Sequence, residues 1–287
     1  NYFVKKLKKI GLKEIKGNFF YSPGIIPEFV TIDPNQLPEE SYNPGFSGLN
    51  LNENKVIFKW RRSGTTYDLS LSYDGRKPNF KPANIKISLA DNGKAIYQYN
   101  SNLSSKEESW FILRKALRNN GSRSLPVRFS ATYTANALKN LCSQQSISMP
   151  DPILSEEKHI RGELVASLES EALLEITKEM LDNSTNVTAE VIGLFAGRKW
   201  GLDFKSIKAS GKLMSSWFDY VSGTSGALMT NHSGLSADSR VSAYDFVKFL
   251  NRESTRDVLP QILKKRRLFG SRNEKLNQSE VSIVAKT

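Results

Sequence analysis

The sequence has few of the residues that disulfides and metal sites require. Cys142 is the single cysteine, so no disulfide can form within the chain. Because Cys142 falls in a helical pattern, we expect it to be a small buried hydrophobic residue. His159 and His232 are the only histidines, and neither has a companion at metal-ligand spacing. The sequence therefore predicts neither a metal centre nor a cofactor site.

Long hydrophobic runs are also missing. No stretch of about 18 apolar residues occurs, so no segment is predicted to span a membrane. The first residues are already basic and amphipathic, unlike a signal peptide, so an exported protein would be seen here in its mature form or as a piece of it. At 287 residues the chain is long enough for roughly two or three domains.

Acidic residues are outnumbered, with 29 Asp and Glu against 41 Lys and Arg, which gives a net charge of +12. Such a surface suits polyanions, so an adaptor for polyanions is one hypothesis, and its binding would fall steeply with added salt. The basic runs at residues 5–16 and 264–267 lack a nucleic-acid-binding motif, and we expect no nucleic-acid partner. A solvated basic surface is the simpler interpretation.

The first half of the chain is predicted to be mostly β-structure. Residues 1–10 form an amphipathic helix with Phe3, Leu7 and Ile10 on one face, expected to pack on a sheet rather than lie on a membrane. Prolines and glycines predict an ordered loop over residues 22–48. Strands are predicted at residues 15–21, 49–60, 68–73, 85–89, 95–99, 110–113 and 125–129.

The second half is predicted to be mainly helical. Ser242 is an N-cap residue with an acid at the third helical position, Asp245, which predicts a helix start. A buried strand is predicted at residues 281–285. The other helices are predicted at residues 132–143, 170–181, 187–197 and 203–220.

Ser184 and Asn186 lie two residues apart between two of these helical runs. Two polar side chains at such a junction can point into the same cleft, although both residues are also ordinary helix caps. Lys286 and Thr287 follow the predicted strand and, taken alone, are a strand end. His232 and Ser233 suggest a Ser–His pair, but a turn with Gly234 is the favoured interpretation.

Five blocks in order resemble one family. Residues 168–190 resemble its Ser-x-Asn segment and residues 231–242 its Ser-Gly-Leu-Ser…Arg-Val block, while residues 285–287 resemble the start of Lys-Thr-Gly. Residues 7–18 and 49–56 resemble its inserted-domain segments. The family is the class C low-molecular-mass penicillin-binding proteins, D-alanyl-D-alanine carboxypeptidases/endopeptidases of peptidase family S13. Departures are Asn18, Thr185, and Asn231 with His232, where the family commonly has Asp, Asp and Asp-Gly.

The resemblance implies an α/β (α+β) penicillin-binding/β-lactamase-like catalytic domain, an antiparallel sheet flanked by helices, with two nested β-rich inserted domains. Residues 1–47 and 125–146 would form the outer insert, and residues 48–124 the inner one. Residues 147–287 would be part of the catalytic domain.

The implied reaction is serine acyl transfer on peptidoglycan stem peptides in the periplasm, with β-lactams as covalent inhibitors and peripheral association with the membrane or cell wall. Ser184 would pass a proton to the leaving amine, and Asn186 would hold the substrate amide carbonyl. Lys286 would supply positive charge, and Thr287 would bind the terminal carboxylate.

The nucleophile motif of the family, Ser-x-x-Lys, occurs here only at residues 155–158. That position lies on the wrong side of the inserted domains, and a solvated linker turn explains it. We therefore expect a fragment of the enzyme, or a sequence that lacks the preceding nucleophile segment. The alternative is a non-catalytic cell-wall-binding protein on the same fold, a pseudoenzyme.

Overall fold

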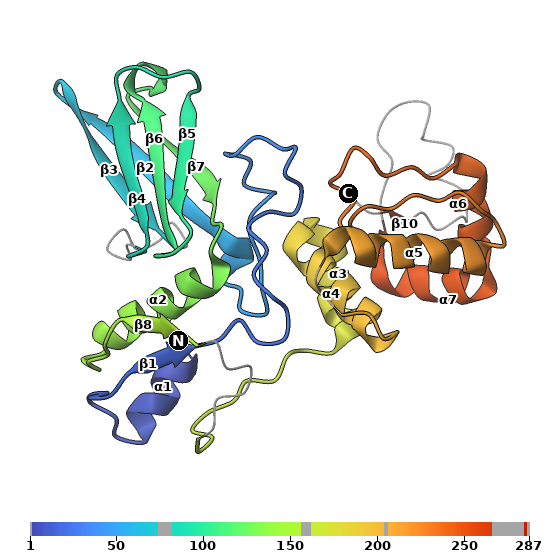
Figure 1. Ribbon diagram of the computed structural model, residues 1–287, viewed down its shortest axis with the longest axis horizontal. Helices are drawn as coiled ribbons and strands as arrows, with labels where there is room; N and C mark the ends of the chain where they lie inside the picture. The colour runs from blue at the N-terminus through green and yellow to red at the C-terminus, as the bar shows by residue number, and fades with distance from the viewer. Residues whose placement is uncertain (1, 74–81, 156–161, 204–205, 266–283, 286–287) are drawn as a thin grey trace. The chain divides into compact units, whose positions relative to one another are not determined.

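The computed structural model describes residues 2–73, 82–155, 162–203, 206–265 and 284–285. It divides into two compact units, Asn1–Leu168 and Glu169–Thr287. The first unit holds most of the described strands, and the second is mainly helical (Figure 1). Residue 147, the predicted start of the catalytic portion, lies within the first unit.

An antiparallel sheet in the first unit has the strand order β3-β2-β7, made of β3 (Thr66–Ser72), β2 (Lys55–Ser63) and β7 (Asn120–Pro126). Val56 and Phe58 alternate inward on β2, as a half-buried strand requires. The predicted strand start at residue 49 was wrong. Residues Asn52–Asn54 form a 3₁₀ turn with positive φ angles, and the buried Asn54 side chain donates to the Gly45 carbonyl at 2.8 Å.

A second sheet has the order β4-β6-β5, made of β4 (Ile85–Ala90), β6 (Glu107–Leu113) and β5 (Tyr97–Asn102). β4 and β6 are parallel, whereas β5 and β6 are antiparallel. A short 3₁₀ helix, Arg114–Ala116, follows β6. Both sheets share one core with helix α2 (Ser130–Ser143). The buried members of that core are Val56, Phe58, Leu71, Tyr73, Ile85, Trp110, Ile112, Leu117, Leu125, Val127, Tyr133 and Ala137.

The predicted strand at residues 125–129 was wrong in its second half, because β7 ends at Pro126 and Phe129 is the N-cap of α2. The cause is Glu108, whose buried carboxylate accepts the backbone N–H groups of Arg128 and Phe129 at 3.0 and 3.2 Å. A side chain thus satisfies donors that a strand ladder would otherwise use. Desolvation of the Glu108 carboxyl raises its pKa to about 7.

Helix α1 (Tyr2–Lys9) forms as predicted, and Leu7 of the predicted face packs against the core, but the partner and the rest of the buried face differ from the prediction. Val4 is its buried residue and packs with Cys142 and Ile147, whereas Phe3 and Ile10 are exposed. The helix therefore contacts α2 rather than a sheet. Burial of Cys142 confirms its prediction as a core residue.

Strand β1 (Phe19–Tyr21) pairs in parallel with β8 (Pro152–Leu154). The Ser155 N–H continues the pairing with a 2.8 Å hydrogen bond to the Tyr21 carbonyl. Ser155 is the first residue of the single Ser-x-x-Lys sequence. The other three residues of that sequence, 156–158, lie outside the described part of the chain. The predicted strand at residues 15–21 is thus confirmed in its last three residues, and β8 was not predicted.

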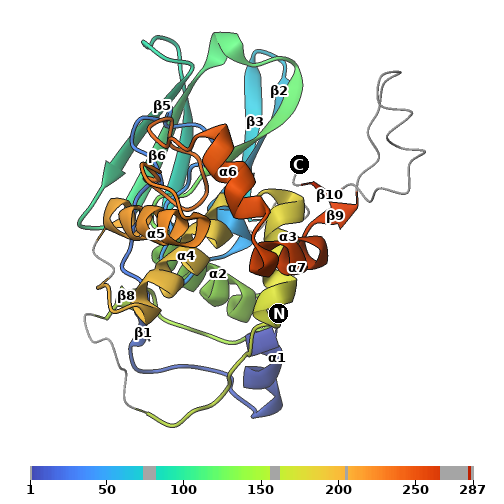
Figure 2. The same cartoon turned by 90° about the vertical axis from the view of Figure 1, so that its right-hand side faces the viewer.

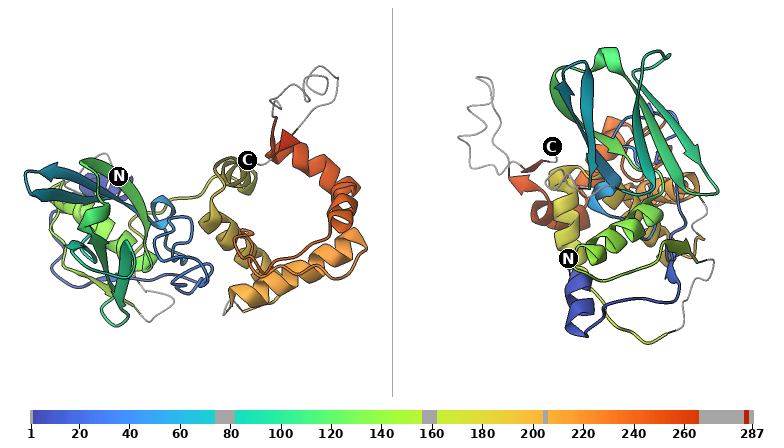
Figure 3. Two further views of the ribbon diagram at one scale, coloured as in Figure 1. Left: turned by 90° about the horizontal axis from the view of Figure 1, so that it is seen from above. Right: turned by 90° about the vertical axis from the view of Figure 1, so that its left-hand side faces the viewer.

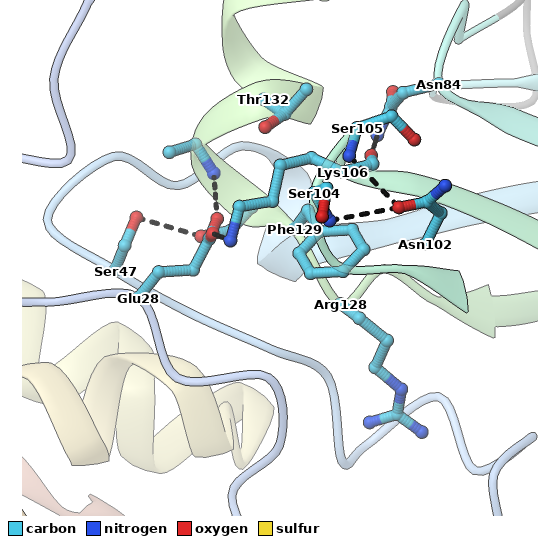
Figure 4. A network of polar contacts seen from close by, with 12 residues as sticks. Glu28, Ser47, Asn84, Asn102, Ser104, Ser105, Lys106, Arg128, Phe129 and Thr132 are labelled. Atoms are coloured by element: carbon cyan, nitrogen blue, oxygen red, sulfur yellow. Dashed lines mark hydrogen bonds and ion pairs between the residues drawn. The ribbon is translucent and has the colours of Figure 1, made fainter. Parts of the chain in front are cut away.

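Polar contacts fasten the loop over residues 22–48 to the start of α2 (Figure 4). The Glu28 carboxylate accepts the Ala131 N–H at 3.3 Å and pairs with Lys106 at 3.3 Å. The Lys106 ammonium lies 5.0 Å from the centre of the Phe129 ring, a cation–π distance. The buried Arg128 guanidinium binds a later part of the loop. It donates to three backbone carbonyls, those of Val30, Pro38 and Asn43.

The second unit has five described helices, α3 (Leu173–Asn183), α4 (Asn186–Lys199), α5 (Ile207–Ser222), α6 (Ala243–Leu250) and α7 (Glu253–Ile262). Each contacts the next, and α7 contacts α3, so they form a closed ring (Figure 3, left; Figure 2). The Ser242 side chain accepts the Asp245 N–H at 3.0 Å, which confirms the predicted cap of α6.

Helix α7 was not predicted; it contains Pro260, a residue that usually ends helices. Strands β9 (Lys264–Lys265) and β10 (Val284–Ala285) pair antiparallel, and the rest of the predicted strand at residues 281–285 lies outside the described residues. Among the described residues, no helix combines the length and the hydrophobicity needed to cross a bilayer.

Candidate active site at the junction of two helices

Ser184 and Thr185 separate helices α3 and α4. Ser184 is the C-cap residue of α3, donates its N–H to the Met180 carbonyl, and has the left-handed angles φ 53° and ψ 47°. Glycine and asparagine are the usual residues at such a position, because other L-residues lose roughly 1–2 kcal/mol there. Helix-capping preference therefore does not explain a serine here, and unfavourable backbone conformations of this kind gather at functional sites.

Asn186 is the first residue of α4, and the N-cap position belongs to Thr185. Preference for the N-cap position therefore explains neither Ser184 nor Asn186. The Ser184 side chain is exposed and Asn186 is half-buried, so both predicted residues lie at the surface of one junction. Lys286 and Thr287 lie outside the described residues.

The Ser-Gly-Leu-Ser block forms a turn on the surface of the helices, as predicted. Gly234 has a φ of 76°, and its N–H donates to the Asn231 side chain at 3.1 Å. Reciprocal backbone hydrogen bonds of 2.7 and 2.6 Å join Leu228 to Arg240 on either side of the turn. We call residues 231–234 the 231–234 turn.

Glu190 of α4 holds this turn. Its side chain is fully buried, and its carboxylate accepts the backbone N–H of His232 at 3.1 Å and that of Ser233 at 2.8 Å. The Ser233 hydroxyl also hydrogen-bonds to it. Desolvation raises the pKa of the Glu190 carboxyl, and these hydrogen bonds oppose the rise.

The His232 ring fits against two helices. Its Nε2 lies 2.8 Å from the Ser210 hydroxyl on α5, and its Nδ1 lies 3.3 Å from the Met214 sulfur. A side chain at Gly193 of α4 would collide with the ring, since a Cβ there would lie 2.0 Å from its Cγ. Desolvation lowers the pKa of His232 to about 4, so the ring is neutral near pH 7. The histidine thus pairs with Ser210 rather than with the neighbouring Ser233.

A mostly apolar cavity of about 220 Å³ lies beside this histidine. Its walls are Gly193, Ala196, Gly197, Trp200, Ser210, Leu213, Met214, Trp217 and His232. Within the described residues, no three His, Cys, Asp or Glu side chains gather to bind a metal ion.

Sequence reasoning missed Glu190 and Ser210. A signal for Glu190 was available: it shares the buried stripe of α4 with Val187, Leu194 and Gly197, at helical spacing. A carboxylate in an apolar stripe is costly to bury and therefore needs donors from another segment. Ser210 had no such signal, because its partner His232 is distant in the sequence.

The family model of the D-Ala-D-Ala carboxypeptidase 3 (S13) family matches residues 1–265. The chain therefore belongs to this family, which confirms the family predicted from the ordered blocks. A search of curated protein sequences finds no match.

Solved structures with the same mixed α/β fold include two of penicillin binding protein 4 (dacB) from Haemophilus influenzae, one of them complexed with a novel β-lactam. Both are 15% identical to this chain, with TM-scores of 0.64 for the complex and 0.66 for the other. The matches cover 94% of this chain and 60% and 61% of those proteins. The chain thus spans less than two thirds of their length.

Proposed function

We propose that the protein is a serine-type D,D-carboxypeptidase/endopeptidase that cleaves D-Ala-containing peptidoglycan stem peptides through an acyl-enzyme. Membership of the S13 family supports this reaction class. The observation that carries the residue roles is the α3–α4 junction, where an exposed serine in a left-handed conformation stands two residues before Asn186.

In this proposal Ser184 passes the proton to the leaving amine, because a hydroxyl can accept one hydrogen bond and donate another at the same time. Asn186 donates from its amide to the substrate carbonyl. Lys286 supplies positive charge to the cleft, and Thr287 binds the terminal carboxylate. The reaction needs a nucleophilic serine one helical turn before the lysine that removes its proton, and residues 1–287 contain no such pair at a suitable position.

The substrate class determines the proposed partners and location. Peptidoglycan lies outside the cytoplasmic membrane, so the proposed site of action is the periplasm, with peripheral association with the membrane or cell wall. β-Lactams are the proposed covalent inhibitors; one of the similar crystal structures contains such a compound.

We also propose that the first unit comprises nested inserts: residues 1–47 and 125–146 around residues 48–124, with residues 147–287 in the catalytic domain. The β1–β8 pairing supports an inserted arrangement, because it brings the two ends of the intervening chain side by side. The six strands of the two sheets all lie between residues 55 and 126, so nearly all of their residues fall in the proposed inner insert, which shares its core with α2.

Covalent labelling of the full-length protein by a fluorescent penicillin tests the proposed function. We expect labelling of the wild type, and a lower acylation rate in Ser184→Ala and Asn186→Ala by about tenfold or more. Ser216→Ala is the matched control, because Ser216 is an exposed serine on α5 that bonds within its own helix. If the wild-type protein is not labelled, the enzyme proposal is wrong.

The pseudoenzyme alternative is favoured by one observation, the absence of a suitably placed Ser-x-x-Lys within residues 1–287. It predicts co-sedimentation with purified peptidoglycan without any penicillin label. Binding that disappears with added salt would instead indicate the polyanion adaptor.

A further inference from the structure

Glu190 lies one helical turn after Asn186 on the same helix, so the two residues share a face of α4. Its carboxylate is fully buried, and no Lys or Arg of the described residues pairs with it. Burying a carboxylate without a cation is costly unless several donors compensate for the lost water. Here the donors are the backbone N–H groups of His232 and Ser233 and the Ser233 hydroxyl.

The two backbone N–H donors show that the carboxylate binds one particular conformation of the turn. Successive backbone N–H groups that converge on one anion form a nest, and a nest exists only in a particular backbone conformation. Glu190 therefore fixes the shape of the 231–234 turn as well as its attachment to α4. Gly193, one turn further along α4, has no side chain and lets the His232 ring approach the helix.

Residues 226–229, which precede this turn, are attached to α5. The Ser215 hydroxyl accepts the Met229 N–H at 2.7 Å. The Asp219 carboxylate accepts the N–H groups of Gly226 and Ala227 at 3.0 and 3.2 Å. Glu190 is thus the carboxylate that joins the loop to the helix of Asn186, whereas Asp219 joins the loop to a different helix.

We propose that Glu190 is a positioning residue for the Ser184–Asn186 site: it holds the 231–234 turn against α4 one helical turn beyond Asn186, and this turn forms one wall of the substrate cleft. This proposal rests on the proposed function of that site. Glu190 does not touch the substrate; it acts through the turn. A misplacement of about 1 Å can lower a reaction rate by up to about a hundredfold.

The test uses Glu190→Gln in the full-length protein, with Asp219→Asn as the matched control. Glutamine keeps the shape of the side chain but removes the negative charge, so its single carbonyl oxygen accepts the two N–H groups more weakly, and its NH₂ group replaces the second oxygen near the His232 N–H. Hydrogen exchange at residues 231–234 should accelerate in Glu190→Gln, and exchange at residues 224–227 should accelerate in Asp219→Asn. The first-order acylation constant at saturating fluorescent penicillin should fall about tenfold or more in Glu190→Gln. It should be unchanged in Asp219→Asn.

The acylation constant separates positioning from a purely structural role. A variant that is merely less stable lowers the fraction of protein finally labelled, not the rate constant of the molecules that label. Faster exchange at residues 231–234 with an unchanged constant would overturn the proposal while the proposed function stands. Unchanged exchange would overturn it as well. Failure of the wild type to label removes the proposed function, and this inference with it.

Discussion

Replacing Gly193 by alanine should destabilise the second unit. A Cβ at this position would lie 2.0 Å from His232 Cγ and 2.2 Å from Nδ1, whereas non-bonded carbon atoms prefer about 3.5–4.0 Å. The ring must therefore move by more than about 1 Å. Moving it disrupts the 2.8 Å contact between Nε2 and the Ser210 hydroxyl.

The expected net effect is a loss of about 2 kcal/mol in the free energy of unfolding. Overpacking costs about 1–3 kcal/mol. The lost Ser210 hydrogen bond adds about 1 kcal/mol. Alanine in a helix returns about 1 kcal/mol relative to glycine.

The measurement is urea unfolding followed by ¹⁹F NMR of fluorotryptophan, because Trp200 and Trp217 line the affected cavity while Trp60 and Trp110 report on the first unit. Gly17→Ala is the control, since a Cβ at Gly17 meets no atom within 4 Å.

A double-mutant cycle gives the decisive result. In a His232→Ala background the collision partner is gone, so Gly193→Ala should become neutral or stabilising by up to about 1 kcal/mol. If Gly193→Ala alone were neutral, or if its effect persisted without the ring, the packing argument would be wrong.

Three further predictions concern other groups. Burial raises the pKa of Glu108 to about 7, against the usual 4.5, so the folded first unit holds the proton of this carboxyl more tightly than the unfolded chain does. The contribution of Glu108 to the free energy of unfolding should therefore be greatest below pH 4.5 and fall by up to about 3 kcal/mol as pH rises through 7. Urea midpoints from pH 4 to 8 check this, and Glu108→Gln should flatten the curve. Arg128→Met leaves three carbonyls without their donor and should cost about 2–4 kcal/mol, with faster hydrogen exchange at residues 30–43; equal exchange would refute the role. Ser184→Gly should be about 1 kcal/mol more stable than Ser184→Ala in thermal melts, because glycine tolerates the left-handed backbone; equal melting would contradict that conformation.

Periodicity and cap chemistry located most helices and strands. The Ser242 N-cap and the burial of Cys142 follow from local pattern alone. The errors arose where a distant side chain or segment decides the structure. Glu108 ends a predicted strand early by taking the N–H groups of Arg128 and Phe129.

The candidate site divides in the same way. The position of Ser184 and Asn186 between two helices was readable, because both flanking helices are periodic in sequence. The left-handed conformation of Ser184 was not readable, since no glycine or asparagine marks it. The burial of Glu190 could be read from its place in the apolar stripe of α4, but its partners could not, because they are backbone groups 42 and 43 residues away in the sequence.

The parallel pairing of β1 with β8 has a consequence for how the first unit folds. It joins residue 19 to residue 152, and it contains only three residue pairs. Closing so long a loop costs much conformational entropy, and the three residue pairs of β1 and β8 do not offset that cost by themselves. The intervening sheets and α2 must therefore form first and hold the ends near each other. The two ends of the first unit therefore pair late, after the segment between them has folded.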